Sequence, residues 1–120
     1  METTTTAPAA NTLVIRENEG KAESQINLDY SAVKSAAMTL RAINHKLRQQ
    51  IIRLLEENKR MNVTDIYVKL RLEQSVASQH LAILRRANIV ITERDGKFIY
   101  YTVNYKRIDE ISQFVKDLVG

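Results

Sequence analysis

The chain has 120 residues, of which 18 are Lys or Arg and 14 are Asp or Glu, so its formal net charge is +4. Hydrophobic residues make up 44% and charged residues 27%, which is typical of one globular domain and too apolar for a wholly disordered chain. The absence of cysteine excludes disulfides, thiolate metal sites, thiol nucleophiles and thiol redox switches. There is no apolar run near the ~18 residues that cross a bilayer and no secretory signal, so we expect a cytoplasmic protein without a membrane partner.

The charges are unevenly distributed along the chain. Residues 1–29 contain two basic and five acidic residues, whereas residues 30–120 contain 16 basic and nine acidic ones. Eight basic and three acidic residues fall between positions 69 and 107. A basic segment inside a folded domain suits a polyanion such as nucleic acid, although a solvated charged face has the same composition.

The first 25 residues are interpreted as a disordered or loosely attached tail, followed by a folded domain over residues 26–120. The tail starts with a Thr-rich stretch that has no apolar period, and residues 17–24 are polar with one glycine. Residues 12–16 can form a short strand, but no nearby segment is typical of a partner for it.

Apolar residues recur at helical spacing in four consecutive segments, which predicts four helices. The expected helices cover residues 30–43, 45–58, 65–70 and 74–87. Asp29 or Ser31 is expected to cap the first helix and Thr64 the third, because their side-chain oxygens accept free amide protons. Only three residues separate the last two helices, a spacing typical of a helix-turn-helix.

After the fourth helix the pattern changes from helical to strand-like. Residues 89–94 and 97–103 are rich in β-branched and aromatic residues, and the Asp95-Gly96 pair between them predicts a type I′ hairpin. An apolar stripe over residues 107–119 predicts a final helix. The fold class is therefore mostly α with a small β-hairpin, in the order α-α-α-α-β-β-α, which is a winged helix-turn-helix.

This arrangement favours a DNA reader. Short polar side chains on the outward face of the fourth helix can meet base edges and phosphates in the major groove, and we expect this role for Gln74, Ser75, Ser78 and Gln79. Arg94 and Lys97 flank the hairpin turn and can hold it on the duplex. Further candidates for phosphate contacts are Arg48, Lys69 and Arg71. The competing interpretation is a polar helix face beside a charged turn.

No set of residues predicts catalysis. The three glycines lie far apart, so no glycine-rich phosphate loop is present. Neighbouring acids such as Glu56 and Glu57 diverge on a helix, and Ser78 and His80 diverge in the same way. We therefore predict that the protein is not an enzyme and carries no catalytic residues.

The fourth helix resembles the recognition helix of the ArsR (arsenic-repressor) family of winged-helix transcriptional regulators. The family pattern is close to Leu-Ser-Gln-Ser-x-Val-Ser-x-His-Leu-x-x-Leu-Arg. It is matched here by Leu72, Gln74, Ser75, Ser78, His80, Leu81, Leu84 and Arg85. Glu73 stands where the family has Ser or Thr, and the resemblance adds His80 to the residues expected at the DNA.

Two further segments are similar to the family. Residues 42–48 resemble its Ala-Leu-x-(Asp/His)-Pro-x-Arg segment, although Lys46 replaces the proline. Residues 96–101 resemble the Gly-basic-x-x-Tyr-Tyr run of its wing. The resemblance covers about residues 30–118 and implies a DNA-binding repressor.

The resemblance also implies a homodimer in which the first and last helices pack across a two-fold axis. The candidate interface residues are Val33, Ala37, Leu40, Ile108, Ile111, Val115 and Leu118. The apolar stripe of the last helix agrees, because an exposed stripe usually marks an interface. The alternative is that this stripe packs on the second helix of the same chain.

The residues with which many relatives sense metals or thiols are absent. Residues 61–66 contain no cysteine, and the last helix contains no histidine, whereas a zinc site needs three or four converging ligands. We therefore expect no metal site and no cofactor, and an effector of unknown chemistry stays open. An alternative function is a winged-helix protein-interaction module that uses the apolar terminal helices.

Overall fold

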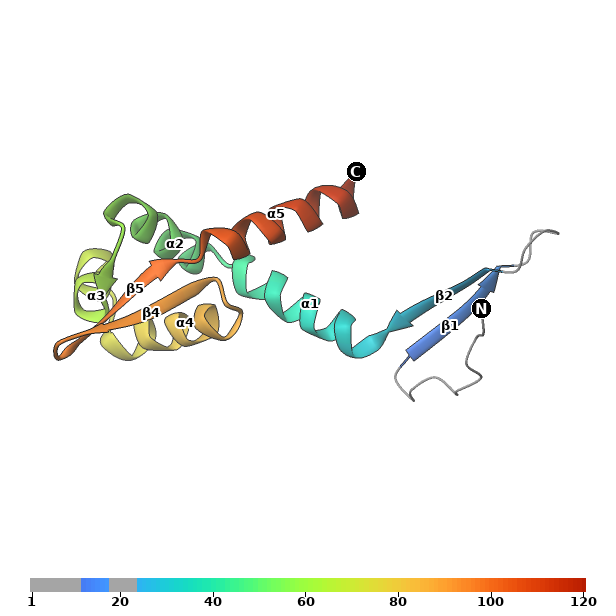
Figure 1. Ribbon diagram of the computed structural model, residues 1–120. Coiled ribbons are helices and arrows are strands. Elements are labelled where there is room, and N and C mark those ends of the chain that lie inside the picture. Colours follow the sequence, from blue (N-terminus) through green and yellow to red (C-terminus); the bar gives the residue numbers. More distant parts are fainter. Residues whose placement is uncertain (1–11, 18–23) are drawn as a thin grey trace. The chain divides into compact units, whose positions relative to one another are not determined.

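The computed structural model describes residues 12–17 and 24–120 (Figure 1). The chain consists of two units, and the boundary in the sequence falls between Met38 and Thr39. The first unit contains strands β1 (Thr12–Glu17) and β2 (Ser24–Asp29) and most of helix α1 (Tyr30–Ile43). The second unit contains the remaining elements.

Strands β1 and β2 form an antiparallel hairpin whose register runs from Thr12 opposite Asp29 to Glu17 opposite Ser24. The cross-strand pairs Leu13–Leu28 and Ile15–Ile26 lie on the same face, because strand side chains alternate. All four of these side chains are exposed. The Asp29 carboxylate then accepts a hydrogen bond from the Ser31 amide at 2.9 Å, as expected for a residue that caps α1.

The hairpin corrects two sequence interpretations. The strand expected over residues 12–16 has a partner, and the boundary placed after residue 25 falls inside β2. The alternation of polar and apolar residues in β2 is a strand signal, but no Asn-Gly or Asp-Gly pair joins it to β1. The rest of the expected tail, residues 1–11 and 18–23, lies outside the described residues.

The second unit has four further helices and three strands in the expected order, with one addition. Its elements are α2 (Lys46–Asn58), β3 (Met61–Asn62), α3 (Val63–Leu70), α4 (Gln74–Arg86), β4 (Val90–Asp95), β5 (Phe98–Val103) and α5 (Tyr105–Val119). The strands form an antiparallel sheet in the order β3-β5-β4. The two-residue strand β3 was not predicted, because it is too short for an alternating pattern.

Side chains cap three of these helices. The His45 ring accepts a hydrogen bond from the Leu47 amide at 3.2 Å and caps α2. Asn62 caps α3 by accepting from the Asp65 amide at 2.8 Å, so the predicted cap Thr64 is wrong and lies inside the helix. Asn104 caps α5 through the Arg107 amide at 3.3 Å.

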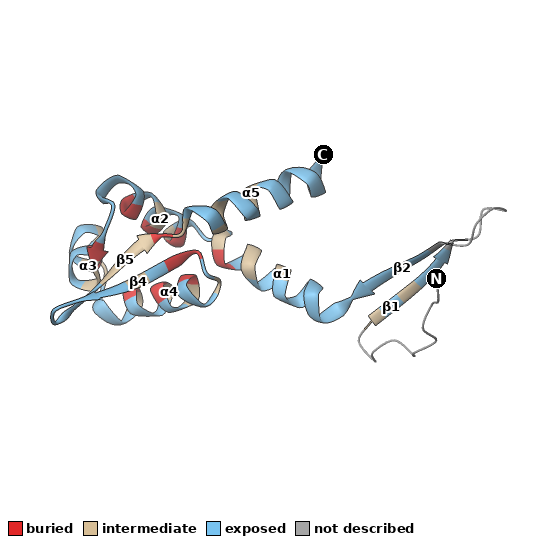
Figure 2. Ribbon diagram, in the orientation of Figure 1, coloured by how far each residue is buried: buried red, intermediate tan, exposed pale blue. Residues whose placement is uncertain are grey.

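One hydrophobic core holds this unit together, and Figure 2 shows its buried residues on α2, α3, α4 and the base of the β4–β5 hairpin. The fully buried large side chains are Ile51, Leu55, Ile66, Leu81, Leu84, Ile89 and Val90. Val90 pairs with the buried Val103, so the base of the hairpin is anchored while its tip projects into solvent.

The hairpin turn differs from the prediction by one residue. Asp95 pairs with Phe98, which leaves Gly96 and Lys97 as the two loop residues. Gly96 has a φ of +66°, and neither Asp95 nor Lys97 has a positive φ. A positive φ at the first loop residue alone is the pattern of a type II′ turn, so the predicted type I′ turn centred on Asp95-Gly96 is wrong. Lys97 therefore lies at the tip.

Candidate nucleic-acid interface

Helices α3 and α4 are joined by a tight turn of three residues, Arg71, Leu72 and Glu73. Arg71 adopts the left-handed conformation with a φ of 56°, and its amide donates to the carbonyls of Tyr67 and Val68. The Leu72 amide also donates to the Tyr67 carbonyl, at 2.9 Å. These bonds satisfy the Tyr67 and Val68 carbonyls in the last turn of α3 and turn the chain directly into α4, as a helix-turn-helix requires.

Helix α4 has a buried face and an exposed polar face. Ala77, Leu81 and Leu84 are fully buried and fix this helix to the core. The four predicted base-contacting residues, Gln74, Ser75, Ser78 and Gln79, are all exposed. Their spacing of i, i+1, i+4 and i+5 places them on one side of the helix. The structure therefore brings these amides and hydroxyls together on a surface that can meet the major groove.

The beginning of α4 has no side-chain cap. Glu73 occupies the N-cap position in an extended conformation, and its side chain makes no capping hydrogen bond. This is the residue at which the sequence departs from the Ser or Thr of the ArsR pattern. The amides of the first turn of α4 thus donate no hydrogen bond to the side chain of the cap residue.

Arg48 does not lie on the surface, contrary to its expected role as a phosphate contact. Its side chain is buried, with Nε donating to the Ala42 carbonyl at 2.7 Å and Nη2 to the Arg41 carbonyl at 3.1 Å. Both carbonyls belong to the last turn of α1, where a positive charge is favourable. Arg48 therefore joins α2 to the end of α1 and is a structural residue.

His80 on α4 is the third partner of this arginine. Arg48 Nη1 lies 3.1 Å from His80 Nδ1, and because arginine only donates, Nδ1 must be the acceptor and the ring proton must lie on Nε2. The His45 ring lies 4.9 Å from the His80 ring, centroid to centroid. Burial lowers the pKa of His80 below its ordinary value of 6.5, and His45 and Arg48 lower that pKa further. His80 is thus half-buried and positioned by Arg48.

The β4–β5 hairpin presents its predicted cations at the tip. Arg94 and Lys97 are both exposed. Sequence reasoning missed Arg60, which ion-pairs with Asp95 at 3.0 Å and lies over the Tyr100 ring at 3.9 Å from its centroid. The hydrogen bond from Arg60 to Asp95 raises the pKa of the guanidinium. No sequence signal points to Arg60, because its partner is 35 residues away.

The remaining predicted phosphate contacts, Lys69 and Arg71, are exposed at the end of α3 and in the turn before α4. The structure thus places two cations beside the start of α4 and further cations on the hairpin. Arg85 and Arg86 are also exposed, at the opposite end of α4.

The expected interface residues fall into two groups. Ile108 and Ile111 are half-buried and pack against the hydrophobic core of the same chain. Val115 and Leu118, further along α5, are exposed, and Phe114 and Val119 are exposed beside them. On α1, Val33 and Ala37 are exposed and Leu40 is half-buried.

Two features are absent from the described part of the chain. No group of three or more His, Asp or Glu side chains is placed to hold a metal ion there. Within residues 12–17 and 24–120, no helix has the length and apolarity needed to span a membrane.

The helix-turn-helix of α3 and α4, the exposed polar face of α4 and the cations of the β4–β5 hairpin define a class of protein. This class is the winged helix-turn-helix transcription regulators, which bind DNA. A sequence model described as "bacterial regulatory protein, arsR family" matches residues 45–92. The transcriptional repressor PagR of Bacillus anthracis is 31% identical over 91 residues, which cover 76% of this chain and 91% of PagR. The chain belongs to the ArsR family, and its relatives are transcription regulators and not enzymes.

Other relatives extend this comparison. The transcriptional activator HlyU of Vibrio cholerae is 31% identical over 83 residues, which cover 69% of this chain and 76% of HlyU. The PagR crystal structure superimposes with a TM-score of 0.57 at 32% identity and covers 74% of this chain and 98% of that one. NolR from Sinorhizobium fredii gives a TM-score of 0.60 at 32% identity, over 74% of this chain and 88% of NolR. The predicted family and fold class are thereby confirmed.

Proposed function

We propose that this protein is a dimeric, sequence-specific transcriptional repressor that works in the cytoplasm, where the DNA it binds is found. The observation that carries the proposal is the division of α4 into a fully buried apolar face and an exposed face of Gln and Ser side chains. Amides and hydroxyls match the hydrogen-bonding pattern of base edges. An uncharged polar face on a basic domain is therefore the surface expected of a helix that reads bases.

The exposed residues of the interface divide into two roles. Gln79 and Gln74 can each pair with an adenine through two hydrogen bonds, while Ser75 and Ser78 accept or donate to several bases. Arg94 and Lys97 on the hairpin, together with Lys69 and Arg71 beside α4, would contact phosphates, which set affinity and orientation but not sequence. Arg48 has no place among them, because its guanidinium is engaged inside the protein.

The proposed dimer is supported by the exposed apolar residues of α5 and α1. Val115 and Leu118 are exposed by 36% and 67%, and Phe114 and Val119 beside them are exposed too, so this end of α5 presents an apolar patch of the kind that marks an interface. A two-fold dimer would place two copies of α4 about 34 Å apart, one turn of DNA, and would favour a pseudo-palindromic operator. Sedimentation analysis should find two chains per particle, and a single chain per particle would contradict this part of the proposal.

Repression is the direction we propose, because the family resemblance implies it and PagR is named a repressor. HlyU is named an activator, so the direction needs a test. The test is a reporter gene controlled by DNA that the protein selects from genomic fragments. Expression of the protein should lower reporter output. A rise in output would reverse the assignment.

DNA binding itself is tested by titration with random duplex at two salt concentrations. Strong binding that weakens steeply with salt is expected, because Lys and Arg side chains release counterions from the phosphates. Absence of binding at low salt would favour the protein-interaction module instead.

Replacing Gln79 by Ala tests the reading face. We expect a loss of about 1–3 kcal/mol of discrimination at one base position, because a pair of hydrogen bonds to one base disappears. The measurement is a comparison of operator variants with the wild-type and Q79A proteins. Gln50→Ala, an exposed glutamine on α2, is the matched control and should leave the profile unchanged. An unaltered profile for Q79A would remove Gln79 from the interface.

Replacing Lys97 by Ala tests the hairpin tip. Binding should weaken to a similar degree on every sequence, and the slope of log affinity against log salt should fall by about one. Lys116→Ala removes the same charge from α5 and serves as the control. Equal slopes for wild type and K97A would show that the tip does not contact phosphate.

A further inference from the structure

Helix α4 ends in a loop whose carbonyls are held by the start of α5. Asn88 has a φ of +66°, its amide donates to the Arg85 carbonyl at 2.9 Å, and the Ile89 amide donates to the Leu84 carbonyl at 2.9 Å. These two bonds make a Schellman motif, in which the chain leaves the helix through a left-handed residue. The three carbonyls of residues 87–89 lie beyond the helix and need donors from elsewhere.

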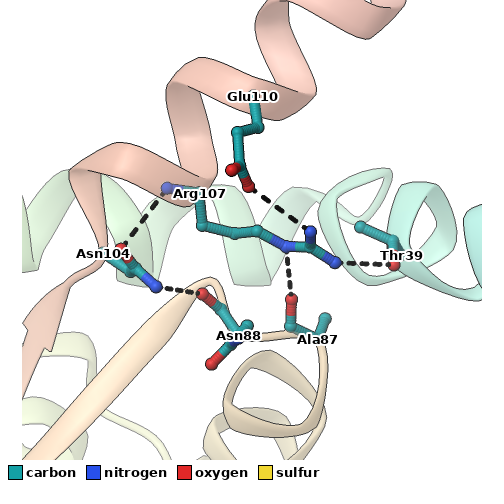
Figure 3. A network of polar contacts seen from close by, with 6 residues as sticks. All are labelled: Thr39, Ala87, Asn88, Asn104, Arg107 and Glu110. Carbon is teal, nitrogen blue, oxygen red and sulfur yellow. Dashed lines mark hydrogen bonds and ion pairs between the residues drawn. The ribbon is translucent and has the colours of Figure 1, made fainter.

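Two residues of the α5 start supply all three donors. Arg107 Nε donates to the Ala87 carbonyl at 3.1 Å, and Asn104 Nδ2 donates to the Asn88 carbonyl at 2.9 Å (Figure 3). The Asn104 amide donates to the Ile89 carbonyl at 2.9 Å. The end of α4 is therefore connected to α5 by directional bonds, in addition to the apolar packing of its inner face.

Arg107 also reaches two other groups with the rest of its guanidinium. Nη2 lies 3.5 Å from the Thr39 hydroxyl on α1, and Nη1 lies 3.6 Å from the Glu110 carboxylate on α5 (Figure 3). The side chain is one third exposed, so the Glu110 pair is screened by water and weak. Arg107 is thus a point at which α1, α5 and the end of α4 meet.

This position matters because apolar packing and hydrogen bonds constrain a helix differently. The buried Ala77, Leu81 and Leu84 hold α4 against the core, but burial is non-directional. Hydrogen bonds have a preferred direction and length, so those at the end of α4 fix its orientation. Over 13 residues, about 20 Å, a tilt of ~5° would move the far end by roughly 1.7 Å, which is enough to break a base contact.

We infer that Arg107 is a positioning residue for DNA recognition, which orients α4 from its C-terminal end without touching DNA. The inference rests on the proposed function, in which the opposite end of α4 reads the bases. In a dimer built on α1 and α5, the same side chain would relate the reading helix to both interface helices.

The test compares R107M and R107K with wild type. Methionine keeps the aliphatic part of the side chain and removes its donors, while lysine keeps the charge but has one nitrogen instead of three. We expect both variants to bind a duplex selected by the wild-type protein about tenfold more weakly, the effect of one lost charge-assisted hydrogen bond. Binding to random duplex at 25 °C should change less than twofold. Glu110→Gln removes only the ion pair and should behave like wild type.

Three results would overturn the inference. Equal weakening on selected and random duplex, with rescue by lysine, would make Arg107 a phosphate contact. Unchanged binding of both variants, with only a lower Tm, would make it a purely structural residue. A second readout is independent of DNA: hydrogen exchange of the amides of residues 84–89 should accelerate in R107M but not in E110Q, and equal exchange would contradict the inference. Absence of wild-type DNA binding would instead contradict the proposed function.

Discussion

The two hairpins of this protein, β1–β2 and β4–β5, have strands of equal length and very different surroundings. Each strand has six residues and each pairing is antiparallel. The β4–β5 hairpin begins and ends at buried valines and gains a third strand, β3. The β1–β2 hairpin has a whole face of exposed Leu and Ile side chains and, among its described residues, none that is buried.

The difference shows what a core adds to a hairpin. A two-stranded ribbon is marginally stable by itself in water, because it buries too little apolar surface to offset its ordering entropy. The base of β4–β5 is buried in the core, which supplies the apolar burial that an isolated hairpin lacks. The tip of this hairpin can therefore be exposed and present cations. In β1–β2 the cross-strand apolar pairs are exposed, so they gain less from burial than the core residues at the base of β4–β5.

The largest expected effect is on the free energy of unfolding, when an isoleucine beside or within each hairpin is replaced by alanine. Ile89→Ala, at a fully buried residue directly before β4, should lower the free energy of unfolding by about 2–5 kcal/mol, because it leaves a cavity in the core. Ile26→Ala, at a side chain that is 53% exposed in β2, should change it by less than ~0.5 kcal/mol. Urea denaturation measures both. Similar losses would break the comparison and place Ile26 in a core of its own.

A smaller loss of unfolding free energy is expected from a change at Arg48, a buried charged residue of a kind that the described part of β1–β2 does not contain. Arg48→Met removes the donor from the carbonyls of Arg41 and Ala42 and from His80. We expect a loss of about 1–3 kcal/mol of unfolding free energy, because one buried acceptor, the Ala42 carbonyl, and two part-buried ones lose their donor. Arg53→Met is the control on the same helix, at an exposed side chain. If both variants lost the same stability, Arg48 would contribute no more than a surface arginine.

The smallest effect concerns pH. The pKa of His80 is lowered by burial, so the folded protein binds fewer protons than the unfolded chain and stability rises with pH. The contribution of His80 to stability should be fully present above about 6.5, the pKa of histidine in the unfolded chain. This contribution should decline as the pH falls below that value. The urea midpoint of the wild type should therefore drop between pH 7.5 and 5.5.

In the His80→Gln variant this drop should be smaller, because glutamine does not titrate. The same dependence in both proteins would assign the pH effect to other groups. Hydrogen exchange of the β1–β2 amides sharpens the comparison, since His80 belongs to the second unit and the relative protection of that hairpin should not depend on this substitution.

The elements that the sequence predicted correctly are those with strong periodicity. The helical spacing of apolar residues located α2, α4 and α5 to within two residues, and the three-residue turn identified the helix-turn-helix. The outward polar face of α4 followed from the same periodicity, because a period of 3.6 fixes which residues share a side. The recognition-helix motif in addition indicated the ArsR family.

The errors concern features that depend on distant partners. The burial of Arg48 could not be predicted, because a charged residue is normally exposed and its acceptors are backbone carbonyls and a histidine 32 residues away. Arg60 was missed for the same reason. The turn shifted by one residue because Asp95 is held in the strand by Phe98 and by Arg60, and neither constraint is visible locally.

The two-residue loop at Gly96-Lys97 has a consequence for how such hairpins can diverge in length. Arg94 and Asp95 project to opposite faces, as neighbouring residues in a strand do. Inserting one residue into each strand would exchange the solvent and core faces beyond the insertion and would bring the acidic side chain to the face that now carries Arg94. Inserting two would preserve both faces and carry the lysine about 7 Å further from the body. Relatives that keep this hairpin should therefore differ in the length of each strand by an even number of residues.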